Sequence, residues 1–441
     1  MRRSKVTVTI GMAVVLFLLT LIQNEADAGR RRRVRARRAT ASRVEIPKTT
    51  APVAESSSVK SCPETPATGY TVDGAVAGKP IHATVDSYAA KYFVENYLSG
   101  NRINANLDQR FNDATAKLAE QGVDRYLLLD LRYEFSTDTA ALLAANQIYS
   151  DSTNRTFREV STREEEIVLA GDAEQLEATA PASDNVVFVF VPGYMWRELK
   201  PDVPSVDFAK EIELLKSQGL AAELLPVDQY GTTQRNGQQV ASRMAELKAA
   251  GKRVILVSTS KGSADVVVAL GKYMPLEDTR HVLGWINVNG AIRGSVVADY
   301  VFECPLRMAV GGMVMRRRFG GHMFGALEMS TSESRRRLRE SSIPAHVEII
   351  NLVGIPMSGQ LSDRGRRYYD RVSELGPNDG SILTADAIHP AGKTIVSVGF
   401  DHYMFDPQIS QKSLALCRAT LRYLLEKQAR QQQDDDAVAS R

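Results

Sequence analysis

One short segment near the middle of the chain limits the possible folds more than any other. An apolar, largely β-branched run at residues 254–257 leads to Ser260, and a helical apolar pattern begins a few residues later at Val266. The sequence therefore predicts a strand and a helix joined by a sharp turn with Ser260 at its apex. Ser258 and Gly262, two residues to either side, are small, as such a turn requires. A serine in this setting can also be no more than a turn former or a helix cap.

The second half of the chain alternates between short apolar runs and amphipathic segments. Strands are expected at 186–191, 222–227, 253–258, 283–289, 347–353 and 394–399. Helices are expected at 206–217, 234–250, 263–273 and 410–428. This alternation predicts an α/β fold with a mostly parallel sheet covered by helices on both faces. Ligands of such sheets bind at the carboxyl ends of the strands, so residues that follow strands are the candidate site residues.

The N-terminus is typical of an export signal. A basic start between Arg2 and Lys5 precedes an apolar run at 6–22 and an A-x-A-like cleavage sequence that ends at Ala28. We expect residues 1–28 to be a signal peptide, so that the protein is exported. An uncleaved signal-anchor in the membrane is the alternative, since the apolar run is at the lower limit for a spanning helix.

A basic segment follows this apolar run. Seven arginines lie between Arg30 and Arg38, within a Ser-, Thr- and Pro-rich stretch at 29–70 that is expected to be a disordered linker. The arginines are either solvated or in contact with an anionic membrane surface. Residues 1–40 carry a net charge of +8, so the total of +3 leaves −5 for the rest. This acidic remainder argues against nucleic acid as a partner.

Residues 71–185 are expected to form a mainly helical accessory region. Its aromatic and aliphatic side chains recur at helical spacing, namely Tyr88, Tyr92, Phe93, Tyr97, Leu107, Phe111, Ala114 and Leu118. The acidic, Ala-rich stretch at 164–183 is expected to be a connection with little structure, and 429–441 to be a disordered tail. Among the cysteines, Cys417 lies in an apolar helical pattern and is expected in the core, and Cys62 with Cys304 is the one candidate disulfide.

A serine hydroxyl is a weak nucleophile that needs a base, an acid to orient the base and donors for an oxyanion. His402 follows the last strand and is the candidate base for Ser260, with His389 as its rival. Asp379 lies in a Gly-Pro-Asn-Asp-Gly turn after the penultimate strand and is the candidate acid, with Asp386 as the alternative.

Backbone N–H groups are the candidate oxyanion donors. One belongs to Lys261, which follows the serine, and the other to Tyr194 or Met195, which follow the turn Pro192-Gly193 after the first strand. The chemistry that these residues imply requires no metal ion and no organic cofactor.

The order Ser260, Asp379, His402 resembles the α/β-hydrolase superfamily, most closely its bacterial lipase/esterase branch. The Pro-Gly turn and the sharp turn at residues 258–262 are part of this resemblance. The sharp turn is similar to the nucleophile elbow of these enzymes, which usually reads G-x-S-x-G and here has Ser258 in place of the first glycine. Residues 293–299 are similar to the G-S-x-x-A-D segment of many lipases. The resemblance implies a hydrolase domain at 186–428 with eight strands or fewer and an acyl-serine intermediate. The elbow also resembles that of acyl-CoA thioesterases and their acyltransferase relatives.

An insertion at about 304–343, here called the insertion, lies where hydrolases of this type often carry a lid. Its five methionines and two phenylalanines suit either a pliable apolar acyl site or packing onto the core. We therefore expect an exported serine hydrolase that cleaves carboxylic esters with an apolar acyl group. The alternatives are a thioesterase or acyltransferase using the same residues, or a non-catalytic surface protein with a degenerate hydrolase fold.

Overall fold

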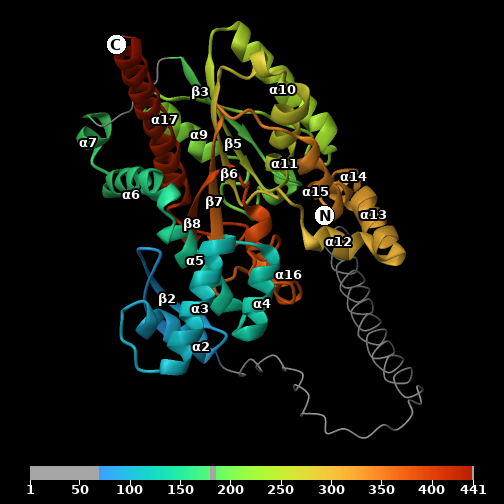
Figure 1. Cartoon of the computed structure of the whole chain (residues 1–441). Helices are drawn as coiled ribbons and strands as arrows, with labels where there is room; N and C mark the ends of the chain where they lie inside the picture. Colours follow the sequence, from blue (N-terminus) through green and yellow to red (C-terminus); the bar gives the residue numbers. More distant parts are fainter. Residues whose placement is uncertain (1–68, 179–184, 440–441) are drawn as a thin grey trace, which may run out of the picture. The chain divides into compact units, whose positions relative to one another are not determined.

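A six-stranded parallel sheet forms the centre of the computed structural model, which describes residues 69–178 and 185–439 (Figure 1). The strands lie in the order β4-β3-β5-β6-β7-β8. They are β3 (Val186–Val191), β4 (Ala221–Leu224), β5 (Arg253–Thr259), β6 (Val282–Val288), β7 (Glu348–Ile355) and β8 (Lys393–Val398). The predicted α/β class is therefore confirmed, and all six predicted strands are present, although β4 is shorter than expected.

Helices cover both faces of this sheet (Figure 1). One face carries α6 (Arg155–Ala170), α9 (Ala209–Ser217) and α17 (Ile409–Ala439), and the other carries α10 (Thr233–Ala249) and α11 (Lys261–Val268). Because side chains of a strand alternate between faces, Phe188 and Phe190 of β3 pack into the first layer, and Val187 and Val189 into the second. Every residue of β3 and β6 is buried, which explains their unbroken apolar sequence.

The accessory region combines a hairpin with helices. The hairpin consists of β1 (Tyr70–Val76) and β2 (Lys79–Val85), and the helical elements are α2 (Tyr88–Tyr92), the π-helix η1 (Phe93–Tyr97), α3 (Ala105–Gln121), α4 (Arg125–Glu134), α5 (Thr137–Ser150) and η2 (Ser152–Asn154). The sequence interpretation missed the hairpin. In the sequence, the hairpin is indicated by the glycine of the turn Ala77-Gly78 and by the alternation of apolar residues in β2. In the structure, both turn residues have positive φ angles, and the apolar residues of β2 are the buried ones.

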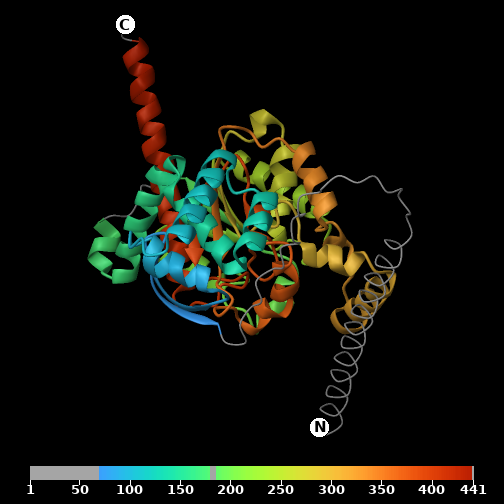
Figure 2. The same ribbon diagram turned by 60° about the horizontal axis from the view of Figure 1, so that its bottom comes forward.

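Two segments expected to lack structure are helical, so both predictions were wrong where the structure describes them. Residues 164–170 belong to α6 and 173–178 to α7 (Ala173–Ala178), because alanine and glutamate favour helix and α6 packs along α17. The predicted tail continues α17 to Ala439, since no glycine or proline interrupts it. Figure 2 shows this end of α17 projecting beyond the neighbouring elements.

The remaining elements surround the carboxyl ends of the strands or join them. They are α8 (Trp196–Leu199), η3 (Ala269–Tyr273), η4 (Leu276–Asp278), α12 (Val296–Phe302), α13 (Pro305–Phe319), α14 (Phe324–Leu327), α15 (Thr331–Glu340), α16 (Asp363–Ser373) and η5 (Thr384–Ala387). The insertion thus consists of α13 to α15. Only Met315 of α13 is buried, whereas Leu306, Met308 and Met313 are exposed, so most of this helix does not pack on the core.

The predicted export signal, the linker with its arginines, and Cys62 lie outside the described residues. Its suggested partner Cys304 is partly exposed at the start of α13. Cys417 is buried in α17 as predicted, and burial raises the pKa of its thiol. Within residues 69–178 and 185–439, no helix combines the length and the apolar character needed to cross a bilayer.

A buried ion pair joins α6 to α17 and provides a test of this packing. Glu164 and Arg418 are both fully buried and lie 2.7 Å apart, and Arg422 contacts the second carboxylate oxygen at 2.6 Å. We predict that Glu164→Gln lowers the free energy of unfolding by about 3–5 kcal/mol, because a buried arginine loses its counter-charge. Urea unfolding monitored by circular dichroism measures the change.

The adjacent residue supplies the control. Glu165 pairs with Lys79 at 2.8 Å, but both side chains are partly exposed. Glu165→Gln should therefore cost at most about 1 kcal/mol. Equal losses in the two variants would contradict the assignment of Glu164 as the main polar link between α6 and α17.

Candidate active site

Ser260 occupies the sharp turn between β5 and α11 that the sequence predicts. Its φ is 49°, a value that non-glycine residues rarely adopt. Neighbouring backbone leaves no room for side chains around it. A Cβ on Gly262 would lie 2.4 Å from the carbonyl oxygen of Val191, and one on Gly193 would lie 3.0 Å from the Cβ of Ser260. The packing of this turn therefore depends on glycine at both positions.

Ser258 stands where the elbow usually has its first glycine, and the structure gives the reason. The side chain is fully buried, and its hydroxyl accepts a hydrogen bond from Nε1 of Trp285 at 2.7 Å. It also lies 2.9 Å from the hydroxyl of Ser263 in α11. The serine thus satisfies a buried indole N–H and links β5 to β6 and to the helix, which a glycine could not do.

The structure brings Ser260, His402 and Asp379 together. Nε2 of His402 lies 3.1 Å from Oγ of Ser260, and Nδ1 lies 2.8 Å from Oδ2 of Asp379. The other oxygen of Asp379 accepts backbone hydrogen bonds from Ser381 at 2.9 Å and Ile382 at 2.7 Å. The carboxylate is therefore oriented by its own turn, and a neutral imidazole with its proton on Nδ1 can accept the serine proton on Nε2.

The surroundings of His402 favour its charged form. Burial of the ring lowers the pKa of His402, but the charge and the hydrogen bond of Asp379, together with the charge of Asp401, raise it further, so that the pKa lies above its ordinary value. An imidazolium formed at this position is thus stabilised by two carboxylates.

The candidate oxyanion donors can be compared directly. The N–H of Met195 donates to the carbonyl of Gln229 at 3.1 Å, so it is already engaged. Among the described residues, the N–H groups of Tyr194 and Lys261 donate to no other group. Because Gly193 packs against Ser260, the N–H of Tyr194, the next residue in the chain, belongs to the turn that lies beside the serine.

The Lys261 side chain has a separate role. Its ammonium group is buried and lies 2.7 and 3.0 Å from the two carboxylate oxygens of Asp265, one turn along α11. Asn236 of α10 donates to the same carboxylate at 2.9 Å. Burial raises the pKa of Asp265 to about 6, although the charge and hydrogen bond of Lys261 oppose this. The ion pair lies inside the fold and fixes the first turn of the helix.

The rival site residues lie elsewhere. His389 is buried against Trp285, and burial and the charge of Arg293 lower its pKa to about 4. Asp386 is buried as well, and its Oδ2 accepts a hydrogen bond from Arg125 of α4 at 3.3 Å. Neither residue forms a hydrogen bond with Ser260 or His402.

Several buried polar residues that hold the site were missed by the sequence interpretation. Asn289 accepts from the N–H of Gly354 at 2.7 Å and donates to the carbonyl of Asp401 at 3.4 Å, so it links β6 and β7 to the histidine loop. Asn287 donates to Asn351 at 2.8 Å. Their signal is an asparagine within or directly after an apolar strand, since buried polar groups require partners.

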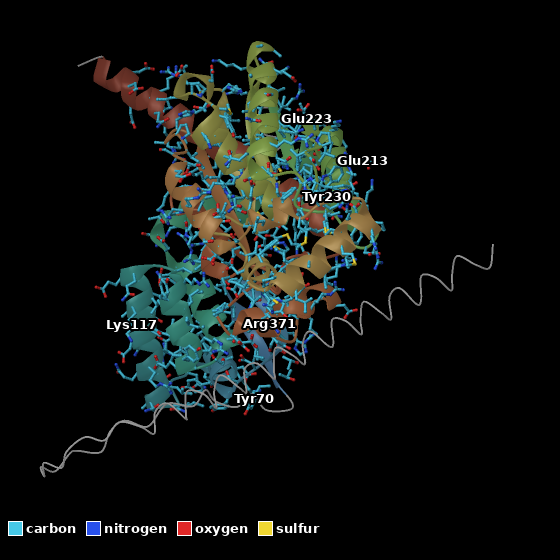
Figure 3. All side chains as sticks on the ribbon, turned by 90° about the vertical axis from the view of Figure 1, so that its right-hand side faces the viewer. Tyr70, Lys117, Glu213, Glu223, Tyr230 and Arg371 are labelled. Carbon is cyan, nitrogen blue, oxygen red and sulfur yellow. The ribbon has the colours of Figure 1, made fainter. Side chains whose placement is uncertain are left out.

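The insertion packs beside the Pro-Gly turn. The hydroxyl of Tyr194 donates to the carbonyl of His322 at 3.1 Å, and its ring makes an edge contact with that of Tyr230, which is labelled in Figure 3. Gly321 lies against this second ring so closely that a Cβ would approach it to 2.6 Å. The residues between α13 and α14 therefore border the turn beside Ser260.

Taken together, the site holds a serine hydroxyl, an imidazole and an oriented carboxylate in hydrogen-bonded series, beside two backbone N–H groups that donate to no other described residue. Acyl transfer to and from a serine requires side chains of these types in this order. Among the described residues, no three His, Cys, Asp or Glu side chains are grouped as a metal ion would require.

Comparison with known proteins finds similarity in structure only. A metagenomic carboxyl esterase is 22% identical, with a TM-score of 0.48 over 56% of this chain and 78% of its own. The mature Bacillus licheniformis lipase is 21% identical, with a TM-score of 0.40 over 54% and 90%. The Staphylococcus hyicus lipase is 10% identical, with a TM-score of 0.41 over 58% and 98%. No family model matches the chain, and no curated protein matches its sequence.

Proposed function

We propose that this protein is a serine hydrolase that cleaves carboxylic esters through an acyl-serine intermediate. The observation that supports this most directly is the hydrogen-bonded series Ser260–His402–Asp379 at the carboxyl ends of the strands. The positive φ of the serine and the unengaged donors beside it are further support. A serine that only forms a turn or caps a helix would not need this combination of features.

In this proposal, His402 removes the proton from Ser260 as its Oγ attacks the ester carbonyl carbon. The carbonyl oxygen becomes an oxyanion that accepts hydrogen bonds from the N–H groups of Lys261 and Tyr194. His402 then gives its proton to the leaving alcohol, and the acyl-serine remains. Water attacks this ester with the same histidine as base, and the carboxylic acid and the free serine are released. Asp379 stabilises the imidazolium in both halves.

We further propose that the substrate is an ester or lipid with an apolar acyl group. Five exposed large apolar side chains are concentrated on the insertion beside the site, namely Leu306, Met308, Met313, Phe324 and Leu327. Exposed large apolar side chains in this number on one short segment favour contact with an apolar ligand or surface.

Export of the protein remains a proposal that rests on the sequence of residues 1–28. Cell fractionation and N-terminal sequencing test it: a mature chain that begins at Gly29 outside the cytoplasm is expected. A chain that keeps Met1 in the membrane fraction would favour the signal-anchor alternative, in which Arg30 to Arg38 lie near lipid headgroups.

We predict that hydrolysis of a panel of p-nitrophenyl esters depends on the Ser260 hydroxyl. Ser260→Ala should lower kcat by about 10⁴-fold or more, because no other group can form the acyl intermediate. A fluorophosphonate probe should label the wild-type protein and leave this variant unlabelled. The control is Ser258→Ala, which removes a neighbouring hydroxyl and should still be labelled. Undiminished hydrolysis by Ser260→Ala would refute the proposed nucleophile, and labelling without hydrolysis of any ester would direct attention to thioesters.

If Asp379 is the acid that orients His402, its replacement should change the pH dependence of kcat/KM. Only neutral His402 can act as the base, and its pKa is raised, so kcat/KM should fall as the pH drops through a value above about 6.5. Asp379→Asn removes the main group that raises this pKa and leaves the burial, so the acid limb should move to lower pH while the rate falls by about 10⁴-fold.

Steady-state kinetics between pH 5 and 9 measure both effects. Asp370→Asn is the matched control, because it neutralises an exposed aspartate of the same segment and should leave the acid limb in place. An acid limb that stays at its wild-type position in Asp379→Asn would mean that another carboxylate orients the histidine.

A further inference from the structure

The turn that carries Asp379 is part of a compact unit, residues 376–387, here called the acid loop. Asp379 lies near its start, and Asp386 lies near its end in η5. Two backbone hydrogen bonds cross the loop. The N–H of Asp379 donates to the carbonyl of Ile382 at 3.0 Å, and that of Thr384 donates to the carbonyl of Pro377 at 2.9 Å, so that Asn378 and Leu383 form a β-bridge. A shift at one end is therefore transmitted to the other.

The core of the protein holds one side of the acid loop. Nη1 of Arg293 donates to the carbonyl of Ala385 at 2.6 Å, and the hydroxyl of Ser295 donates to that of Ser381 at 2.7 Å. Asn287 of β6 donates to the carbonyl of Ala387 at 2.9 Å. These bonds all come from β6 or from the segment that follows it.

The accessory region holds the opposite side through α4. Arg125, at the first position of that helix, donates to Oδ2 of Asp386 at 3.3 Å. Three leucines of α4 share one apolar cluster with three residues of the acid loop: Leu127, Leu128 and Leu131 with Ile382, Ala385 and Ala387. One side of the acid loop is therefore packed against residues that lie more than two hundred positions earlier in the sequence.

Asp386 depends on its cations because it is almost completely buried. Burial raises the pKa of Asp386, and the charges of Arg125, Arg335 and Arg293 counteract this. Arg335 of α15 approaches Oδ1 only to 3.6 Å, and that oxygen has no hydrogen-bond partner within the described residues. The contact from α4 is therefore the shortest ion pair of this carboxylate.

The accessory region has other attachments, so the loss of this ion pair does not detach it. Both oxygens of Asp138 in α5 accept from Ser358, one from the N–H at 2.9 Å and one from the hydroxyl at 2.6 Å. The hydroxyl of Tyr369 reaches the same carboxylate at 3.3 Å, and the N–H of Gly359 donates to Thr84 at 3.1 Å.

We propose that Arg125 is a positioning residue: by holding Asp386, it keeps the acid loop in place and Asp379 against His402. The accessory region then has a defined task in the reaction, which is to fix the geometry of the acid. This inference rests on the proposed function, because it assigns a consequence for catalysis. An acid displaced by about 1 Å can cost a rate factor on the order of 100.

The test compares Arg125→Met with the wild-type protein in two measurements. In steady-state ester hydrolysis, kcat should fall by about 10- to 100-fold with little change in KM, because the ester-binding surface is untouched. In an NMR titration of the His402 imidazole, which needs no substrate, the pKa should fall below the wild-type value because Asp379 pairs less closely. Arg125→Lys restores the charge and should recover part of both effects.

Lys117→Met is the control, since it removes an exposed cation of α3 in the same region (labelled in Figure 3) and should change neither readout. If Arg125→Met does not fold, Arg125→Met/Asp386→Asn, which also removes the buried carboxylate charge that Arg125 compensates, is titrated in its place with the same expected fall in the pKa of His402.

A wild-type kcat and a wild-type His402 pKa in these variants would overturn the inference. So would a lowered melting temperature with an unchanged His402 pKa, because Arg125 would then serve stability alone. Absence of Ser260-dependent hydrolysis in the wild-type protein would overturn the proposed function instead, and the NMR titration would still decide whether Arg125 positions Asp379.

Discussion

The positive φ of Ser260 is the constraint on which the rest of the site depends. To hold this backbone conformation, the N–H of Ser260 donates to Val288 of β6 at 3.3 Å, and its carbonyl accepts from Ala291 at 2.9 Å. Gly193 and Gly262 also pack closely against this turn. The backbone conformation of Ser260 therefore depends on the correct pairing of β3, β5 and β6 and on the loops that follow them. Such strain persists only where the surrounding structure determines it fully.

The sequence interpretation succeeded where the pattern is local. The strand and helix around Ser260, the six strands and the juxtaposition of Asp379 with His402 all follow from periodicity, turn chemistry and position after a strand. The choice of Asp379 over Asp386 rested on a glycine-flanked turn, and in the structure this turn supplies the two N–H groups that orient the carboxylate.

It failed where distant residues determine the outcome. Glu164 looks like part of a solvated acidic stretch until α17 places Arg418 against it. Likewise, nothing near Arg125 in the sequence indicates a contact with Asp386, because 261 positions separate them. Pairings over such separations are set by topology, and local propensity does not encode them. The hairpin at the start of the accessory region is a different case, since its alternation and turn were legible.

The ion pair between Lys261 and Asp265 has a consequence for how this elbow can evolve. Both side chains are buried within the first turn of α11, directly behind the serine. A neutral residue at either position alone would leave an uncompensated charge in the interior, at a cost of several kcal/mol. Related chains are thus expected to have charged residues at both positions or neutral residues at both. Replacement of one charged residue should be accompanied by replacement of the other.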